Sequence, residues 1–568
     1  MPQDAYTLRQ LNRELSPLLV GGKISRINQP EKDKLSLLIY THAGTVKLDV
    51  QLCAKFCRIS VNEKTVDDNP KNAPNFCMLL RKHLQNAQIT YVGQVDFERV
   101  IYFDLLTFSE FSSCVMRLHF EIMGKYSNAV LTKDGIIVGA LKTTSLESAK
   151  RVTLTGAKYT LPEKQDKADP TKLHELEELF AARYGDVNGL SALGDTAKFI
   201  SERVAGIAFV TAAEMVLTYG ERPTAREIYD YVNGDYLQPC ITYVNGVPAD
   251  FKVRSEMSGK RGYPTLLQAQ AAYYEYAVGL SKFNDGCRRL TSVLDGAIKK
   301  AEKRLVQICD KLAECEKLEE VKLYGELITA NMYAIQRGNS ELKAVNYYDE
   351  NCAEVTIPLD KQLTPSQNAQ RYYKRYAKLK RTLDNAAAQK AEVEARLSYL
   401  HSIGETIKAA ESQTDLQGIR QELISLSLME DASAQKGKKK VKAVESPFRT
   451  FSFGGFTIIC GRNNVQNERL TKGLTESDIW LHTKSFHSSH VGILTEGKAA
   501  TDEAIKFAAE VCAYYSAARG KDKVPVDFTL KKHVKRPNGS PMGFAVYTDF
   551  KTIIVTPDKH GEARSDDE

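Results

Sequence analysis

Residues 294–315 read LDGAIKKAEKRLVQICDKLAEC, in which apolar side chains recur at alternating steps of four and three. The residues in this register are Leu294, Ile298, Ala301, Leu305, Ile308, Leu312 and Cys315. A second run keeps the register, with one lysine inside it: Leu379, Leu383, Ala386, Lys390, Val393, Leu397 and Leu400. Such a seam is typical of coiled coils, so we expect a long antiparallel hairpin, or else pairing between two chains.

The two runs and the segment between them predict a middle domain over 241–430, with a small tip at about 322–365. The tip is dense in aromatic and amide groups, at 324–327, 346–349 and 368–374. An arm of about 40 residues reaches about 60 Å as a helix. A soluble protein uses such an arm as a spacer toward a large partner.

Residues 1–170 have the pattern of an α+β domain with a large antiparallel component. Leu8, Leu11 and Leu15 mark a helix that ends at Gly21-Gly22. A second helix is predicted at 76–84, and strand-like runs occupy 34–40, 45–50, 57–61, 100–107, 115–122, 129–132 and 136–140. Residues 158–172 are rich in Pro, Lys, Asp and Gln and predict a linker.

Residues 171–240 favour a small bundle of short helices, broken by glycines. Within it, 205–211 could form the hairpin of a helix-hairpin-helix module, which binds phosphate through main-chain amides, or a plain turn. After the coiled coil we expect a basic linker over 431–445, an α/β domain over 446–560 and a disordered tail over 561–568. One Ala-rich helix is predicted at 502–519.

The charge of the chain gathers near its C-terminal end. The 568 residues carry a net charge of only +7, yet 435–560 holds 21 Lys and Arg against 12 Asp and Glu. Basic density on one domain suits RNA phosphates, because each contact releases counterions, and a solvated basic surface is the alternative.

Composition excludes several classes of protein. At 43% hydrophobic and 26% charged residues, the chain is not disordered as a whole. No apolar run approaches the roughly 20 residues of a membrane helix. The eleven cysteines are dispersed without a CxxC, which predicts reduced thiols. Since no signal-peptide pattern opens the sequence, we expect a cytoplasmic protein with no membrane partner.

Candidates for catalysis are weak. Residues 492–499 have phosphate-loop spacing, but Ala499 stands where magnesium requires a hydroxyl. Pro2 invites comparison with an N-terminal amine nucleophile, but Gln3 stands where a carboxylate is required. Three histidines lack an evident fourth zinc ligand: His482, His487 and His490. We therefore expect no catalytic residue, no metal site and no cofactor.

A polar group in the first domain is more informative. Glu98-Arg99 precedes a predicted strand, and Arg81 and the segment 121–128 belong to the same domain. An adjacent acid and arginine form either a salt bridge at a strand edge or a guanidinium fork for phosphate or base edges, steadied by the carboxylate.

Several such motifs, in order along nearly the whole chain, resemble the NFACT family. They are 76–84 (FCMLLRKHL), Glu98-Arg99, 121–128 (EIMGKYSN), the tip segments, 415–423 (DLQGIRQEL), 461–464 (GRNN) and 478–482 (DIWLH). Bacterial members are often labelled fibronectin-binding proteins. The chain departs from the family at Glu98, where Asp is common, and at 486–490, where FHSSH replaces a Pro-Gly-Ser-His turn.

The resemblance implies a multidomain α+β architecture. Its parts are a glycosylase-like NFACT-N domain at 1–170, a helix-hairpin-helix module, the coiled-coil middle domain and an RNA-binding NFACT-R domain at 446–560. It also implies ribosome-associated quality control. Such proteins bind obstructed large ribosomal subunits carrying peptidyl-tRNA and recruit charged tRNA, chiefly alanyl-tRNA, for untemplated C-terminal alanine tailing. The peptide-bond chemistry would be the ribosome's, and the protein would act as a monomer there.

By motif match, the resemblance implies tRNA binding by Glu98, Arg99, Glu121, Ile122, Met123, Arg81 and Lys125. For the C-terminal domain we expect rRNA binding by Lys531, Lys532, Lys535, Arg536, Arg462, Asn463 and His482, with Trp480 mostly structural. The alternatives are a ribosome- or RNA-binding protein without tailing, and a surface fibronectin-binding adhesin.

Overall fold

Antiparallel strands dominate the first 140 residues of the computed structural model, which describes residues 3–62, 72–108, 113–144, 151–163, 166–184, 193–430, 447–538 and 540–561. Nine strands form one sheet in the order β4-β3-β2-β1-β5-β6-β7-β8-β9. They are β1 (Lys23–Glu31), β2 (Lys34–Thr41), β3 (Gly44–Gln51), β4 (Arg58–Asn62), β5 (Gln88–Gln94), β6 (Val100–Phe108), β7 (Ser113–Glu121), β8 (Asn128–Lys133) and β9 (Ile136–Ala140). Strands β1 and β5 were not predicted, and the other seven were.

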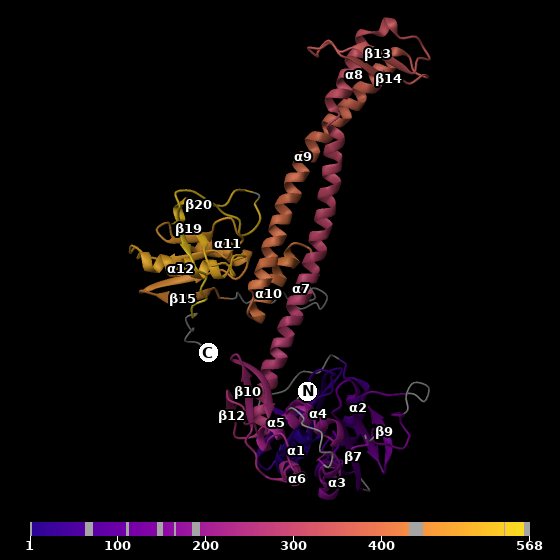
Figure 1. The fold of residues 1–568 in the computed structure, drawn as a ribbon, viewed down its shortest axis with the longest axis vertical. Helices are drawn as coiled ribbons and strands as arrows, with labels where there is room; N and C mark the ends of the chain where they lie inside the picture. Colours follow the sequence, from indigo (N-terminus) through magenta and orange to yellow (C-terminus); the bar gives the residue numbers. More distant parts are fainter. Residues whose placement is uncertain are drawn as a thin grey trace. The chain divides into compact units, whose positions relative to one another are not determined.

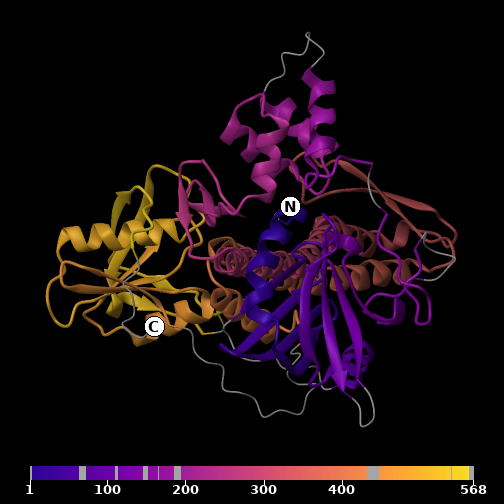
Figure 2. The ribbon, with the colours of Figure 1, turned by 90° about the horizontal axis from the view of Figure 1, so that it is seen from below.

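Two helices pack on this sheet. Helix α1 (Ala5–Leu19) begins at Asp4, whose carboxylate accepts from the Thr7 amide at 2.9 Å, and it places Leu8, Leu11 and Leu15 in the core. Figure 2 shows α1 lying against the strands, and its neighbour there is β5. Helix α2 (Asn75–Leu84) packs against β1 and β9. Both helices were predicted, because their apolar residues follow the helical period.

A helical module and a small sheet complete the N-terminal unit, which ends at Ser281. The helices are α3 (Leu173–Tyr184), α4 (Leu193–Arg203), α5 (Phe209–Tyr219) and α6 (Ala225–Asn233). The strands are β10 (Cys240–Val244), β11 (Val247–Lys252) and β12 (Lys260–Gly262), which the sequence did not predict. Ile241 and Phe251 join the core of the N-terminal unit, although the coiled-coil domain was predicted to begin at 241.

The second unit, Lys282–Glu568, is built on two long helices. Helix α7 (Leu266–Cys315) starts in the first unit and packs along α9 (Pro365–Ala409), as Figure 1 shows. The Cys315 thiol lies 3.6 Å from the Leu379 carbonyl oxygen, so the end of α7 meets the first half of α9 and the two helices run antiparallel. The predicted seam is confirmed, since Leu294, Ile308 and Leu400 are buried in it.

The tip of this pair has its own small core. Helix α8 (Leu318–Ala330) and the hairpin of β13 (Glu341–Val345) and β14 (Glu354–Pro358) bury Leu327, Ile328 and Ile357. This small core overlaps the predicted tip at about 322–365. After α9 the chain forms α10 (Gln413–Ser425), which packs back on α9.

The C-terminal domain is a six-stranded sheet in the order β15-β16-β18-β17-β19-β22. Its strands are β15 (Arg449–Phe453), β16 (Phe456–Cys460), β17 (Ile479–Thr483), β18 (Val491–Leu494), β19 (Val524–Leu530) and β22 (Lys551–Val555). Helix α12 (Asp502–Tyr514) packs on the sheet and ends five residues earlier than predicted, while α11 (Asn464–Gly473) lies beside β16 and β18. The predicted linker at 431–445, the predicted tail apart from Gly561, and Pro2 lie outside the described residues.

Candidate nucleic-acid interfaces

Arg99 lies immediately before β6 and is held through its backbone. The Ile122 amide donates to the Arg99 carbonyl oxygen at 2.8 Å, which ties Arg99 to the segment that follows β7. The Arg99 side chain is partly exposed and makes no hydrogen bond or ion pair with any described residue. Its guanidinium is therefore available for a partner.

Glu98, like Arg99, is held through its backbone. It is partly exposed, its amide donates to the Val95 carbonyl at 3.0 Å, and its carbonyl accepts from Gln94 Nε2 at 2.8 Å. These contacts form a tight turn before β6. The turn fixes where the Arg99 side chain leaves the backbone.

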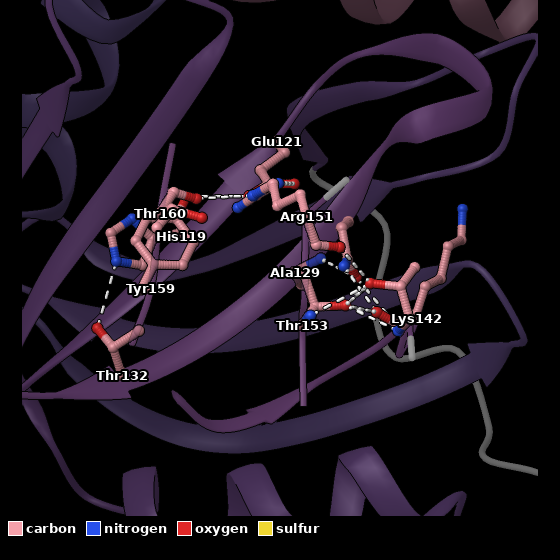
Figure 3. Close-up of polar contacts among 11 residues, drawn as sticks. His119, Glu121, Ala129, Thr132, Lys142, Arg151, Thr153, Tyr159 and Thr160 are labelled. Carbon is pink, nitrogen blue, oxygen red and sulfur yellow. Dashed lines mark hydrogen bonds and ion pairs between the residues drawn. The ribbon is translucent and has the colours of Figure 1, made fainter. Parts of the chain in front are cut away.

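Glu121, at the end of β7, is an internal anchor. Its carboxylate is 2% exposed and accepts from both terminal nitrogens of Arg151, at 2.6 and 3.0 Å, and from the Tyr159 hydroxyl at 2.9 Å. Figure 3 shows this arrangement, with Arg151 and Tyr159 reaching Glu121 from a segment some 30 residues further on. Direct contact between Glu121 and tRNA is not supported by this geometry, because the carboxylate is buried and already accepts three hydrogen bonds.

An aromatic stack supports the same anchor. The Tyr159 ring stacks on His119 with centroids 4.0 Å apart, and His119 Nε2 lies 3.2 Å from Thr132 Oγ1 (Figure 3). Burial lowers the pKa of His119 to about 3, so its ring is neutral at physiological pH. Tyr159 had been assigned to a linker; the structure instead packs it on the sheet.

The segment after Glu121 presents a charged surface. Ile122 is buried, Met123 is half-buried, and Gly124 takes a φ of +60° that starts a short turn. Lys125 and Tyr126 are exposed at that turn, with the ammonium 4.9 Å from the ring centroid. Among the described residues of this segment, Lys125 is the cation that a polyanion can reach.

The Arg81 side chain, on α2, makes hydrogen bonds within the protein. Its Nε donates to the Ile27 carbonyl at 2.8 Å and one terminal nitrogen donates to Asn28 Oδ1 at 3.1 Å. These bonds join α2 to β1. The side chain is only partly exposed, so the structure gives Arg81 a structural role beside the predicted one.

In the second unit, two motifs far apart in sequence meet at a buried carboxylate. Asp415 of α10 is 1% exposed and binds Arg449 of β15 at 3.3 Å and Arg462 at 3.0 Å. Burial opposes its ionisation, but the Arg449 and Arg462 charges and the Glu411 amide keep the pKa of Asp415 below its usual value. This network joins the C-terminal domain to the base of the coiled coil.

The neighbouring asparagines serve the same junction. Asn463, 4% exposed, caps α11 by accepting from the Gln466 amide at 2.8 Å. Asn464 donates to Glu422 of α10 at 2.9 Å and to Ser402 of α9 at 3.0 Å. Arg462 and Asn463 were predicted to bind rRNA. The structure uses both inside the protein, since a buried polar group must be paired.

The lysines of the C-terminal domain remain on the surface. Lys532 and Lys535 are exposed and Lys531 is half-exposed, around the short 3₁₀ turn that follows β19. Arg536 is exposed but pairs with Glu468 at 2.8 Å. His482 of β17 is half-buried and stacks on Trp480, with centroids 5.7 Å apart. Trp480 itself is 1% exposed.

Arg151 and Tyr159 were not among the predicted site residues. They lie 30 and 38 positions from Glu121, and no local pattern links them to it. Pairings of this kind follow from tertiary packing. Within the described part of the chain, no group of three or more His, Cys, Asp or Glu side chains could hold a metal ion, and none of the helices is apolar over a length that would cross a membrane.

This chain belongs to the NFACT family. Residues 4–442 match the family's N-terminal and middle domains, and residues 447–543 match the NFACT protein RNA binding domain. The chain is 31% identical to the Rqc2 homolog RqcH of Bacillus subtilis over 562 residues, covering 96% of both chains. It is 30% identical to the protein of the same name from Streptococcus suis, covering 98% of both.

A solved structure is also similar. The N-terminal part of the fibronectin/fibrinogen-binding protein from Streptococcus suis superposes with a TM-score of 0.42 at 24% identity, covering 48% of this chain and 98% of that one.

Proposed function

We propose that this protein is a ribosome-associated quality-control factor. It binds large ribosomal subunits obstructed by peptidyl-tRNA and recruits alanyl-tRNA, so that the nascent chain receives an untemplated C-terminal alanine tail that marks it for degradation. The similarity to RqcH proteins over 96% of both chains carries this proposal, because the family's N-terminal and middle domains and its RNA-binding domain are present in one chain. The peptide bond is formed by the ribosome, and the protein supplies binding and orientation.

Two separate groups of cations support binding to two kinds of RNA, tRNA by the N-terminal domain and rRNA by the C-terminal domain. Arg99 and Lys125 offer cations to tRNA, and the Glu121–Arg151 pair holds the segment that carries Lys125. Lys531, Lys532 and Lys535 offer cations to rRNA. Phosphate contacts of this kind position a nucleic acid, whereas base contacts select it.

We assign the finer architecture on the same grounds. Residues 1–170 act as the NFACT-N domain, 171–240 as the helix-hairpin-helix module and 241–430 as the coiled-coil middle domain. A protein of this kind acts in the cytoplasm, one copy on each subunit. The coiled-coil arm, whose 45-residue helix α9 spans about 68 Å, separates its tip from the RNA-binding domain.

The test is a charge reversal at Arg99. Arg99→Glu should still sediment with large subunits but lose co-purifying alanine tRNA and alanine tails, because a carboxylate repels phosphate. Arg26→Glu is the matched control, since Arg26 is exposed on β1 of the same sheet and its side chain makes no hydrogen bond or ion pair with any described residue. Tails should persist in the control.

Two results would contradict the proposal. Tailing that survives Arg99→Glu removes the role of Arg99. Wild-type protein that purifies with large-subunit rRNA but no tRNA favours the second candidate, a subunit-binding protein without tailing; the altered turn at 486–490 is the observation that keeps this candidate open.

A further inference from the structure

A cavity of about 670 Å³ lies inside the second unit, between α9 and the C-terminal domain. Three sequence segments that carry or vary the family pattern line it: 461–464 through Arg462 and Asn464, 478–482 through Trp480 and His482, and 486–490. The first segment and the last are separated by the 21 residues 465–485, yet they share one cavity. Its volume falls in the range of sites that bind small molecules or single nucleotides.

The interior of the cavity carries little net charge. Arg462 is already bound to Asp415 at 3.0 Å, and Glu405 is bound to Lys408 at 2.8 Å. Burial lowers the pKa of His490 to about 3 and that of His482 to about 4, so both rings are neutral. Such a lining does not suit a phosphate group. It suits a neutral ring with polar edges, which imidazole nitrogens and serine hydroxyls can hydrogen-bond.

The apolar part of the lining is unusually exposed. Met542 is 44% and Phe544 is 49% exposed, and Phe486 is half-buried. Large apolar side chains left open beside polar groups mark binding sites. Aromatic rings and histidines are also the side chains on which single-stranded RNA bases stack.

Besides Arg462, which lines the cavity, three cations lie next to lining residues in space or in sequence. The exposed Lys521 places its ammonium 4.3 Å from the Phe486 ring centroid. Lys484 sits between the lining residues Thr483 and Ser485 in sequence, and Arg536 donates to the carbonyl of the lining residue Ser540. A neutral interior with a cationic surround fits a nucleotide whose base enters while its phosphates stay outside.

We propose that this cavity binds one unpaired RNA base, turned out of its helix or loop. The inference deepens the proposed function and rests on the RNA-binding role of the C-terminal domain. Ser398, Tyr399 and Ser402 of α9 complete the wall, so the arm and the domain together form the site.

The test uses the full chain and two synthetic RNA stem-loops. One carries a single bulged adenosine, and the other carries an abasic residue at the same position. The wild-type protein should bind the bulged RNA about tenfold more tightly, the effect of one base stack. Equal affinity for the two RNAs would overturn the base pocket while leaving the RNA-binding role intact. Failure to bind either RNA would overturn both.

A cavity-filling variant locates the effect. Ser398→Trp places an indole in the mouth from an exposed position on α9, and it should reduce the tenfold preference to about one while affinity for abasic RNA stays unchanged. Glu392→Trp is the control, since Glu392 is exposed on the same helix and does not line the cavity. A preference that survives Ser398→Trp, or disappears equally in Glu392→Trp, contradicts the site.

The source of the base is identified in cells. Protein is crosslinked to RNA labelled with 4-thiouridine, and the RNA attached to the wild type is compared with that attached to Ser398→Trp. Loss of large-subunit rRNA crosslinks assigns the base to the ribosome, and loss of tRNA crosslinks assigns it to tRNA. Unchanged crosslinks in both classes contradict the proposal.

Discussion

Both units bury a carboxylate against arginine, but the two arrangements leave different groups on the surface. In the N-terminal unit, Glu121 binds Arg151, and the guanidinium of the nearby Arg99 has no hydrogen bond or ion pair with any residue that the structure describes. In the second unit, Asp415 binds both Arg449 and Arg462, so the Arg462 guanidinium is already paired inside the protein. Arg99 is therefore accessible to RNA because the neighbouring Glu121 is paired with Arg151, whereas Arg462 is itself paired with Asp415.

Removing the acid in the second unit should have the largest effect. Asp415→Ala leaves Arg449, 1% exposed, without its counter-charge and should cost about 3–5 kcal/mol of the free energy that docks the C-terminal domain. Hydrogen exchange of β15 and α10 would measure the loss. In the control Glu405→Ala, the exposed pair with Lys408 is removed, and the cost should stay below about 1 kcal/mol. Equal protection in both variants would mean that the Asp415 network does not hold the domain.

Breaking the pair in the N-terminal unit should cost less. Arg151→Ala should lower the free energy of unfolding by about 3 kcal/mol, the low end for a broken buried pair, because the Arg151 side chain is 23% exposed. It should also weaken tRNA binding. Arg151 pairs with Glu121, and without this ion pair the segment that carries Lys125 is no longer held in place. Tyr159→Phe removes one of the three hydrogen bonds and should cost about 1 kcal/mol. If Arg151→Ala left tRNA affinity unchanged in a folded protein, the anchor would have no part in binding.

Acidification should weaken both units in the same direction. Burial, together with the Arg117 charge for His119 and the His482 ring for His490, lowers the pKa of His119 and of His490 to about 3. The unfolded chain takes up these protons near pH 6.5, so the stability is complete above that pH and is lost as pH falls toward the folded pKa. From pH 7 to pH 5 each histidine should cost about 2 kcal/mol. Denaturation of His490→Gln should show a shallower dependence on pH; an unchanged slope would mean that His490 does not titrate as argued.

The smallest effect is expected from a single surface lysine. Lys535→Ala should reduce the slope of log affinity against log salt by roughly 0.9 and weaken RNA binding modestly and without regard to sequence. Arg536→Ala should change this slope less, because Arg536 is already paired with Glu468 at 2.8 Å. Filter-binding titrations at several salt concentrations would measure both slopes. A larger change of this slope for Arg536→Ala than for Lys535→Ala would contradict the expectation that a cation already in an ion pair contributes less to RNA binding.

Local patterns predicted much of this fold. The seam at 294–315, helix α1 and most strands of the first sheet follow apolar periods of 3.6 or 2 residues, which depend only on neighbours in sequence. Strands β1 and β5 were missed because both mix exposed and buried residues without a regular alternation. The strands at 240–262 were missed because a long helical pattern follows them immediately.

The candidate site was only partly predictable. Arg99 and Lys125 stand where the family motifs place them, and both are accessible. Glu121, Arg462 and Asn463 belong to the same motifs, yet the structure pairs each of them within the protein. A motif identifies residues that matter without saying whether they face a partner or another part of the chain.

From the sequence alone one could predict two long helices with a coiled-coil seam, a first domain rich in antiparallel strands and a basic C-terminal domain. These follow from periodicity and charge, which act over a few residues. Tertiary packing alone brings Arg151 and Tyr159 to Glu121 and pairs Asp415 with Arg462. It also places three motif segments around one cavity. The three pairings join residues 30, 38 and 47 positions apart, so they depend on packing that no local pattern records.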